Sequence, residues 1–178
     1  MAPPKPSMVA MAASSGSMAN NDHKTWNTFA PGDRIDDIRE VFRSSRGQVV
    51  EAIVVWRNRV IASYHFNGKR TVYVGAHPRN DIILPVFASR DIAHGLLQLD
   101  PGCTVHIAPQ MKGTFYRGSE SPVTLESLLA GNKLMRTGAS HSLNLNQDEM
   151  VKVDFSDDVS IIVRFVEAVR PPLLAPWF

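Results

Sequence analysis

The residues of this chain that could do chemistry are few and scattered. Its six histidines are His23, His65, His77, His94, His106 and His141. None of them stands in an H-x-x-x-H or H-E-x-x-H spacing, so a zinc site would need distant segments to converge. The single cysteine, Cys103, excludes an internal disulfide and a cysteine-built zinc site. We therefore expect no metal and no cofactor.

A nucleophile and a base stand side by side in Ser140-His141, within the stretch GASHS. No G-x-S-x-G elbow surrounds them, and neighbouring residues of a strand point to opposite faces. The acidic pairs Asp36-Asp37 and Asp157-Asp158 are typical of solvated charge, and no glycine-rich loop matches a phosphate-binding fingerprint. The sequence thus predicts a protein that is not an enzyme, with hydrolysis at Ser140 as the alternative to test.

Composition argues against a nucleic-acid partner. The 178 residues carry a net charge of only +2, whereas a nucleic-acid binder shows a larger, clustered basic excess. Basic and aromatic residues alternate over the first predicted hairpins, a pattern that proteins use to bind single-stranded nucleic acid. These residues are Trp56, Arg57, Arg59, Tyr64, Lys69, Arg70 and Tyr73. Trp56 lies in an apolar run, which favours core packing.

The chain divides into four predicted segments. Residues 1–30 lack periodicity and are expected to be a disordered tail. Residues 31–48 hold a short helix, predicted over Asp33 to Arg43 with Asp33 as its cap, and a linker. Residues 49–169 form the folded domain, and residues 170–178 are a Pro-rich linker.

The domain reads as short strands joined by turns. Val49 to Arg57 and Val60 to Phe66 predict a hairpin with Asn58-Arg59 as its link, and Asn67-Gly68 predicts the next turn. Further strands are predicted at Thr71–Val74, Ile82–Leu84, Gly95–Leu99, Thr104–Ala108, Gly113–Tyr116, Ser142–Leu145, Met150–Phe155 and Ser160–Val166. One helix is predicted over Thr124 to Ala130, with Gly131 after it. The fold class is therefore all-β, an antiparallel β-sandwich with one short helix, to which the N-terminal segment can add another.

The stretch Val72 to Leu84, VYVGAHPRNDIIL, resembles the signature of forkhead-associated (FHA) domains, whose fold is an FHA/SMAD-like sandwich. The resembling positions are Gly75, His77, Pro78, Asn80, Asp81, Ile82 and Leu84, and Ser89-Arg90 is similar to the family's Ser-Arg element. The resemblance implies phosphothreonine-peptide binding. However, Ala76 stands where the family has its phosphate-binding arginine, and Ile92 stands where it has a histidine.

A longer resemblance covers roughly Val50 to Pro172. It is to the degenerate FHA-like cytoplasmic domain of delta-proteobacterial gliding-motility envelope proteins, which continue into a transmembrane helix and a TonB-like periplasmic end. The matching motifs are Val54–Ile61, Thr71–Gly75, Ile82–Pro85, Met111-Lys112-Gly113, Phe165-Val166 and Pro171-Pro172. This resemblance implies a location at the cytoplasmic face of the inner membrane, and a protein partner that is a motility motor or a regulatory small G-protein system.

The leading hypothesis is therefore a non-catalytic adaptor that binds a protein partner through loops at one end of the sandwich. Those loops are Gly75 to Asp81, Pro85 to His94 and Gly118 to Val123, because rigid scaffolds commonly carry recognition on their loops. The candidate contact residues are His77, Arg79, Asn80, Ser89, Arg90 and Asp91. Phosphothreonine-peptide binding through Arg79, Ser89 and Arg90 is the alternative, and strand addition at a sheet edge is a third.

Overall fold

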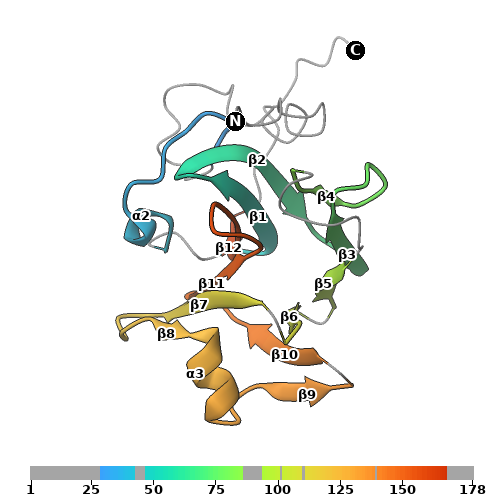
Figure 1. Cartoon of the computed structure of the whole chain (residues 1–178), viewed down its shortest axis with the longest axis vertical. Coiled ribbons are helices and arrows are strands. Elements are labelled where there is room, and N and C mark those ends of the chain that lie inside the picture. The colour runs from blue at the N-terminus through green and yellow to red at the C-terminus, as the bar shows by residue number, and fades with distance from the viewer. Residues whose placement is uncertain are drawn as a thin grey trace, which may run out of the picture.

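Two six-stranded sheets face each other in the computed structural model, which describes residues 29–42, 47–85, 94–100, 102–109, 111–138 and 140–167 (Figure 1). Sheet A has the order β2 (Arg59–Phe66), β1 (Val49–Trp56), β12 (Val159–Val166), β11 (Glu149–Asp154), β7 (Lys112–Arg117) and β8 (Val123–Thr124). Sheet B has the order β4 (Ile82–Ile83), β3 (Arg70–Gly75), β5 (His94–Leu99), β6 (Cys103–Ile107), β10 (Ser140–Leu145) and β9 (Met135–Thr137). The predicted all-β sandwich is confirmed.

The sandwich departs from a purely antiparallel design at one edge. β3 and β4 run parallel, with Val74 opposite Ile82, because the chain loops back beside β3 before it crosses to β5. The short strands β8 and β9 were not expected from the sequence, since two or three residues carry too little periodicity to be recognised. The tail and the Pro-rich linker predicted at the ends fall outside the described residues, apart from Phe29 and Ala30.

The first hairpin turns one residue earlier than predicted. Arg57 and Asn58 both have positive φ, 48° and 65°, which defines a two-residue turn with a left-handed conformation at both positions. Asn58 tolerates that conformation well, and Arg59 instead enters β2 opposite Trp56. The twist of this turn matches the right-handed twist of the strands that it joins.

The main core lies between the sheets and follows the alternation of the strands. Its central side chains are fully buried and apolar, among them Val54, Val72, Leu97, Val105, Val151, Ile161 and Val163. Helix α3 (Leu125–Ala130) closes the sandwich near β7 and β8, and buries Leu125 and Leu128 in the same core. The predicted helix is therefore present, with the Thr124 hydroxyl as its N-cap and Gly131 at its end.

A glycine permits the close approach of β7, β11 and α3. A Cβ at Gly113 would overlap the carbonyl oxygen of Lys152 and lie 2.9 Å from Cδ1 of Leu125. Neither the strand ladder nor a fully buried leucine can move aside without breaking other contacts. Gly113 therefore sets the distance between the sheet and its covering helix.

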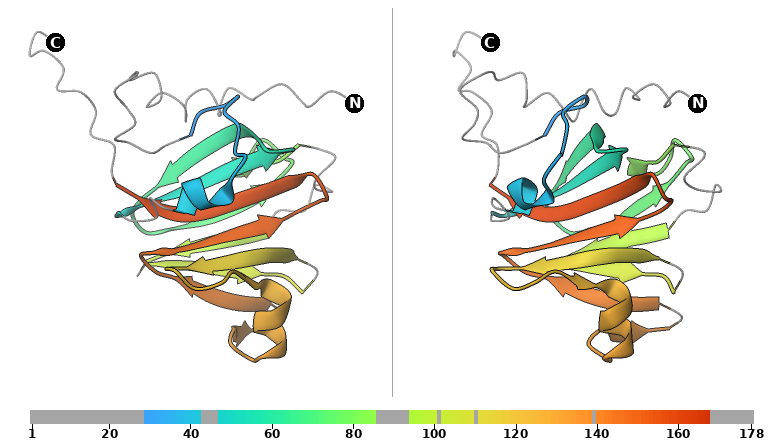
Figure 2. Two further views of the ribbon diagram at one scale, coloured as in Figure 1. Left: turned by 90° about the vertical axis from the view of Figure 1, so that its left-hand side faces the viewer. Right: turned by 60° about the vertical axis from the view of Figure 1, so that its left-hand side comes forward.

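The outer face of sheet A is covered by residues 29–42, which we call the strap (Figure 2). The strap ends in helix α2 (Ile38–Phe42), which is shorter than the predicted helix. Asp33 does not cap it: its carbonyl accepts a hydrogen bond from Val60 N (2.8 Å) and its carboxylate one from Ala30 N (2.8 Å). Extended pairing with the start of β2 satisfies the backbone groups that the predicted first helical turn would have used.

The strap seals a second apolar cluster. Its buried members are Ile35, Val41, Ile53, Val55, Val60, Met150 and Ile162, and Phe29, Ile38, Phe42 and Tyr116 pack around them. The predicted apolar face of the N-terminal segment is thus used against sheet A. No helix among the described residues is long and apolar enough to cross a bilayer.

A fully buried ion pair lies beneath the strap. Arg164 of β12 and Glu51 of β1 stand directly opposite each other, with Nε and Nη2 of Arg164 each 2.8 Å from Oε1 of Glu51. Arg164 also donates to the carbonyl of Val41 (2.6 Å) and stacks on the ring of Phe29. The other carboxylate oxygen of Glu51 lies 2.9 Å from Nε2 of His65. This network joins three strands to both ends of the strap.

Replacing Gly113 with alanine is expected to cost about 1–3 kcal/mol of unfolding free energy, because the added methyl overpacks the contact between sheet and helix. Gly131→Ala is the matched control, since its Cβ would meet only Ser127 O at 3.4 Å and the Lys133 side chain. Urea unfolding followed by circular dichroism measures both. Equal midpoints for the two variants would contradict the close approach.

Arg164→Ala is expected to destabilise the domain by about 3–5 kcal/mol, because it leaves the Glu51 carboxylate buried without its counter-ion. Arg34→Ala removes an exposed pair with Asp36 and should cost only about 0–1 kcal/mol. The double variant Glu51→Gln/Arg164→Met should recover part of the loss, since no unpaired charge remains. Thermal and urea unfolding of the four proteins test this order, and a double variant no better than Arg164→Ala would refute the electrostatic account.

Candidate functional site

The register of the strands decides which loops share an end of the sandwich. At one end, which we call the loop end, β3 reaches Gly75, β5 starts at His94, and β10 places His141 opposite Ile107. The turns at 57–58 and 155–158 lie beside each other, because Trp56 pairs with Val159, and they are at the same end because β2 leads away from them and β3 returns to Gly75. The predicted loop Gly75 to Asp81 belongs here, as do Pro85 and His94, the described residues of the second predicted loop.

The third predicted loop, Gly118 to Val123, lies at the opposite end. β7 runs away from the loop end, with Lys112 opposite Asp154 and Arg117 opposite Glu149. Gly118 N then donates to the carbonyl of Asp148 (3.0 Å) in the turn after β10. The prediction that all three loops gather at one end is therefore wrong. The direction of each strand within the sheet cannot be read from its own residues.

The β3–β4 loop is held in one conformation by its own hydrogen bonds. The carbonyl of His77 accepts bonds from Asn80 N and Asn80 Nδ2, both at 3.0 Å, and Arg79 N donates to Nδ1 of His77 (3.0 Å). At its base, Leu84 N donates to the carbonyl of Gly75 (2.9 Å). The loop is thus a closed turn rather than an open connection.

Asp81 anchors this loop to β3. One of its carboxylate oxygens accepts a bond from Tyr73 N (2.9 Å), and the other pairs with the guanidinium of Arg70. The Arg70 side chain also lies over the ring of Phe66 in β2. The loop therefore folds back along its own strand, and a neighbouring strand braces it.

These contacts separate the predicted site residues. Asn80 is buried and its amide is used within the loop, so its role is to shape the loop. His77 and Arg79 are exposed, and the Arg79 side chain makes no ion pair with any described residue. Ser89, Arg90 and Asp91 lie outside the described residues.

Another arginine of the loop end is already engaged. Arg57 Nε lies 3.4 Å from the carboxylate of Asp158, and its guanidinium stacks on Trp56 at 4.7 Å from the ring centroid. Arg57 N also donates to the carbonyl of Asp158 (3.0 Å). Arg57 therefore joins two turns, whereas the Arg79 guanidinium is exposed, makes no ion pair among the described residues, and can donate to the acceptor groups of a ligand.

Ser140 and His141 do not form a nucleophile–base pair among the described contacts. They are successive residues of β10, and Nδ1 of His141 is buried without a hydrogen-bond partner among the described residues. A different serine–histidine contact, which sequence reasoning missed, joins Ser142 Oγ to His106 Nδ1 at 3.2 Å. Only their position opposite each other in β10 and β6 brings these residues together.

Burial shifts the pKa values of three described side chains, His106, Cys103 and Tyr116, and it raises that of the Tyr116 hydroxyl. Desolvation, helped by nearby His94, lowers the pKa of His106, so that the neutral imidazole is favoured. Burial raises the pKa of the Cys103 thiol to about 12, which keeps it protonated and unreactive at neutral pH. Among the residues that the structure describes, no group of three or more potential ligands is placed to hold a metal ion.

Most described sheet edges are short. β4 and β8 have two residues each and β9 has three, which limits pairing with an added strand. The longer edge strand β2 is partly covered at its start, where Gly32 N donates to the carbonyl of Val60 (2.7 Å) and Arg34 bridges to Arg59. This arrangement favours loops and faces over strand addition as the means of recognition.

Comparison with known proteins gives no assignment: no protein-family model, no curated protein and no solved structure matches this chain.

The candidate residues should respond differently to truncation. Asn80→Ala removes a buried amide that holds the loop, and is expected to lower the unfolding free energy by about 1 kcal/mol. Arg79→Ala removes an exposed side chain and should change it by less than about 0.5 kcal/mol. Urea unfolding measures both, and a larger loss for Arg79→Ala than for Asn80→Ala would show that the two roles are reversed.

Proposed function

We propose that this domain is a non-catalytic module that binds a protein partner through its loop end. The observation that carries the proposal is the braced β3–β4 loop, which holds the exposed Arg79 on a rigid sandwich. A loop that is already ordered loses little conformational entropy on binding. An exposed arginine that makes no ion pair among the described residues can donate to backbone carbonyls or carboxylates of a partner.

The wider role that we propose is that of an adaptor on the cytoplasmic side of an envelope-spanning gliding-motility machine. Its support is the resemblance over Val50 to Pro172, with a motility motor or a small G-protein system as the partner. The strand–loop–strand arrangement of Val72 to Leu84 is compatible with that resemblance.

Phosphothreonine-peptide binding is the second candidate, and it is favoured by the exposed Arg79, which makes no ion pair among the described residues. A phosphate needs charge-assisted contacts, preferably bidentate ones, and Arg79 can offer two parallel donors. Against it, Ala76 occupies the position of the family's phosphate-binding arginine, and Arg57 is held by Asp158. The two candidates differ in whether the partner must be phosphorylated.

A quantitative capture experiment tests both candidates. The full chain is immobilised, partners from a lysate of the source organism are identified, and the purified partner is titrated with and without phosphatase treatment. Arg79→Glu is expected to weaken the partner's affinity by about 10-fold or more, because it reverses a charge at the contact. Lys69→Glu makes the same charge change in the turn at the opposite end of β3 and should leave the affinity unchanged.

The outcomes separate the alternatives. Binding that survives phosphatase and is lost in Arg79→Glu supports a protein-binding module. Binding that disappears on phosphatase treatment supports phosphopeptide recognition instead. Equal affinities for the Arg79→Glu, Lys69→Glu and unmodified chains would contradict a site at the loop end.

A further inference from the structure

The outer face of sheet B has an unusual composition. The core residues of β3, β5, β6 and β10 point inward, so the residues between them point away from sheet A. We call these outward residues, together with one from β9, the neutral face: Thr71, Tyr73, Gly95, Gln98, Thr104, His106, Ser142, Asn144 and Met135. None of them is Asp, Glu, Lys or Arg, in a chain in which 20% of the residues are charged. Depletion of charge is typical of the centre of a protein interface.

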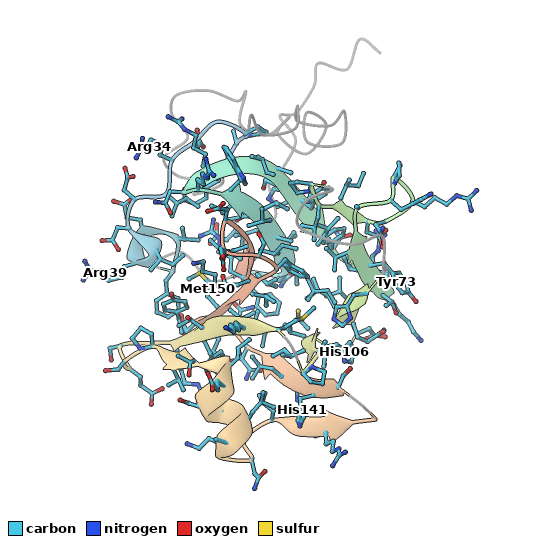
Figure 3. All side chains as sticks on the ribbon, in the orientation of Figure 1. Arg34, Arg39, Tyr73, His106, His141 and Met150 are labelled. Carbon is cyan, nitrogen blue, oxygen red and sulfur yellow. The ribbon has the colours of Figure 1, made fainter. Side chains whose placement is uncertain are left out.

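The structure leaves this face open over its described part. The strap and α2 lie on the other side of the molecule, and α3 contacts β7 and β8 (Figures 1 and 2). Figure 3 shows Tyr73 and His106 on the side away from Arg34 and Arg39, which mark the strap. The outer faces of the two sheets therefore differ: the strap covers that of sheet A, and no described element covers that of sheet B.

The polar side chains of the neutral face are already ordered in pairs. Thr71 Oγ1 donates to Gln98 Oε1 (2.6 Å), and Thr104 Oγ1 donates to Asn144 Oδ1 (2.9 Å). Each pair uses the amide oxygen and leaves the amide NH2 group as an outward donor and the hydroxyl oxygen as an acceptor. His106 adds a neutral imidazole between them, bonded to Ser142.

Two large apolar side chains stand at opposite margins of the face. Among the described residues, the exposed large hydrophobic side chains are Tyr73 (47% exposed), Val123 (36%) and Met135 (65%), and two of these three belong to the neutral face. Tyr73 is on β3 and Met135 on β9, and each of these strands is two positions from β6 in the sheet order. The pattern is therefore symmetric about β6.

We propose that the neutral face binds a second copy of this chain, about a two-fold axis that runs along β6. Such an axis exchanges β3 with β9 and β5 with β10. Tyr73 of one protomer then meets Met135 of its partner, and Gln98 meets Asn144. His106 lies on the axis and faces its own symmetry mate, which its neutral form permits.

The pairs that the axis creates are chemically complementary. A methionine sulfur against a tyrosine ring is a favourable contact, and the two amides can exchange hydrogen bonds. A strongly charged partner surface would find no counter-charge on the neutral face. A second copy of the face is also uncharged, and its hydrogen-bond donors can pair with the acceptors of the first copy. This is the reason for choosing a second copy as the occupant.

The size of the face implies weak association. Five strands at ~4.8 Å spacing and about five residues of ~3.3 Å each cover roughly 400 Å² per protomer. A stable complex usually buries about 800 Å² per partner. The dimer is therefore expected to form at high local concentration, as when several chains are held in one assembly. This surface is separate from Arg79, so the inference does not rest on the proposed function.

Sedimentation velocity of the full chain, from about 10 μM to about 1 mM, tests the proposal in the range of weak association. The unmodified chain should shift toward a dimer as its concentration rises. Tyr73→Lys and Met135→Glu should each weaken association by about 10-fold or more, because the first places an ammonium group against the Met135 side chain and the second places a carboxylate against the electron-rich ring of Tyr73. Val123→Lys changes an exposed apolar residue of β8, outside the face, and should associate as the unmodified chain does.

The double variant Tyr73→Lys/Met135→Glu tests the two-fold axis itself. Each new carboxylate would meet the new ammonium group of the other protomer, so association should return to within about 3-fold of the unmodified chain. Circular dichroism confirms that all variants are folded. A chain that stays monomeric at every concentration would overturn the proposal. This holds also if the face is covered by another part of the same chain. A dimer that ignores both single substitutions, or a double variant as weak as the single ones, would overturn it too.

Discussion

The buried pair between Glu51 and Arg164 is the constraint on which the rest of this sandwich depends. Two fully buried charges are tolerated only when they meet each other and when hydrogen bonds satisfy their remaining groups. Here the partners are on neighbouring strands, and a slip of one residue in either strand would turn a charge into the core between the sheets. The pair therefore fixes the register of β1 and β12, which are neighbouring interior strands of sheet A.

The same pair determines which surfaces of the domain are available. Arg164 reaches beyond Glu51 to the carbonyl of Val41 and to the ring of Phe29, so the strap is joined to sheet A by polar contacts as well as by apolar packing. Without the strap, an apolar cluster and a buried ion pair would face water. The strap closes the outer face of sheet A in this way, whereas the loop end and the outer face of sheet B remain exposed among the described residues.

Local patterns in the sequence predict most of the strands, because alternation and turn residues act over a few neighbours. Val49 to Trp56 shows both the success and the limit. Its β-branched residues predict a strand correctly, yet nothing near Glu51 reveals that its counter-ion lies 113 residues further on. Turn positions fail by small margins, as at Arg57-Asn58, where the backbone conformation of a neighbour decides the outcome. Gly118 and Gly75 lie at opposite ends of the sandwich, and this depends on the direction of every strand in the sheets, which no short motif contains.

The candidate site could likewise be predicted only in part, because local patterns identify its residues but not their contacts. These contacts also connect the loop to the outer face of sheet B. His77, Arg79 and Asn80 were recognisable from their loop, but only the fold assigns Asn80 to shaping the loop and leaves Arg79 exposed. Tyr73 was visible as one aromatic residue of a strand, and only the sheet order relates it to Met135. Asp81 bonds the backbone of Tyr73, so the loop that presents Arg79 is fixed to the margin of the neutral face. The Arg79 loop and the neutral face therefore share strand β3. A ligand that displaces the loop must also disturb β3.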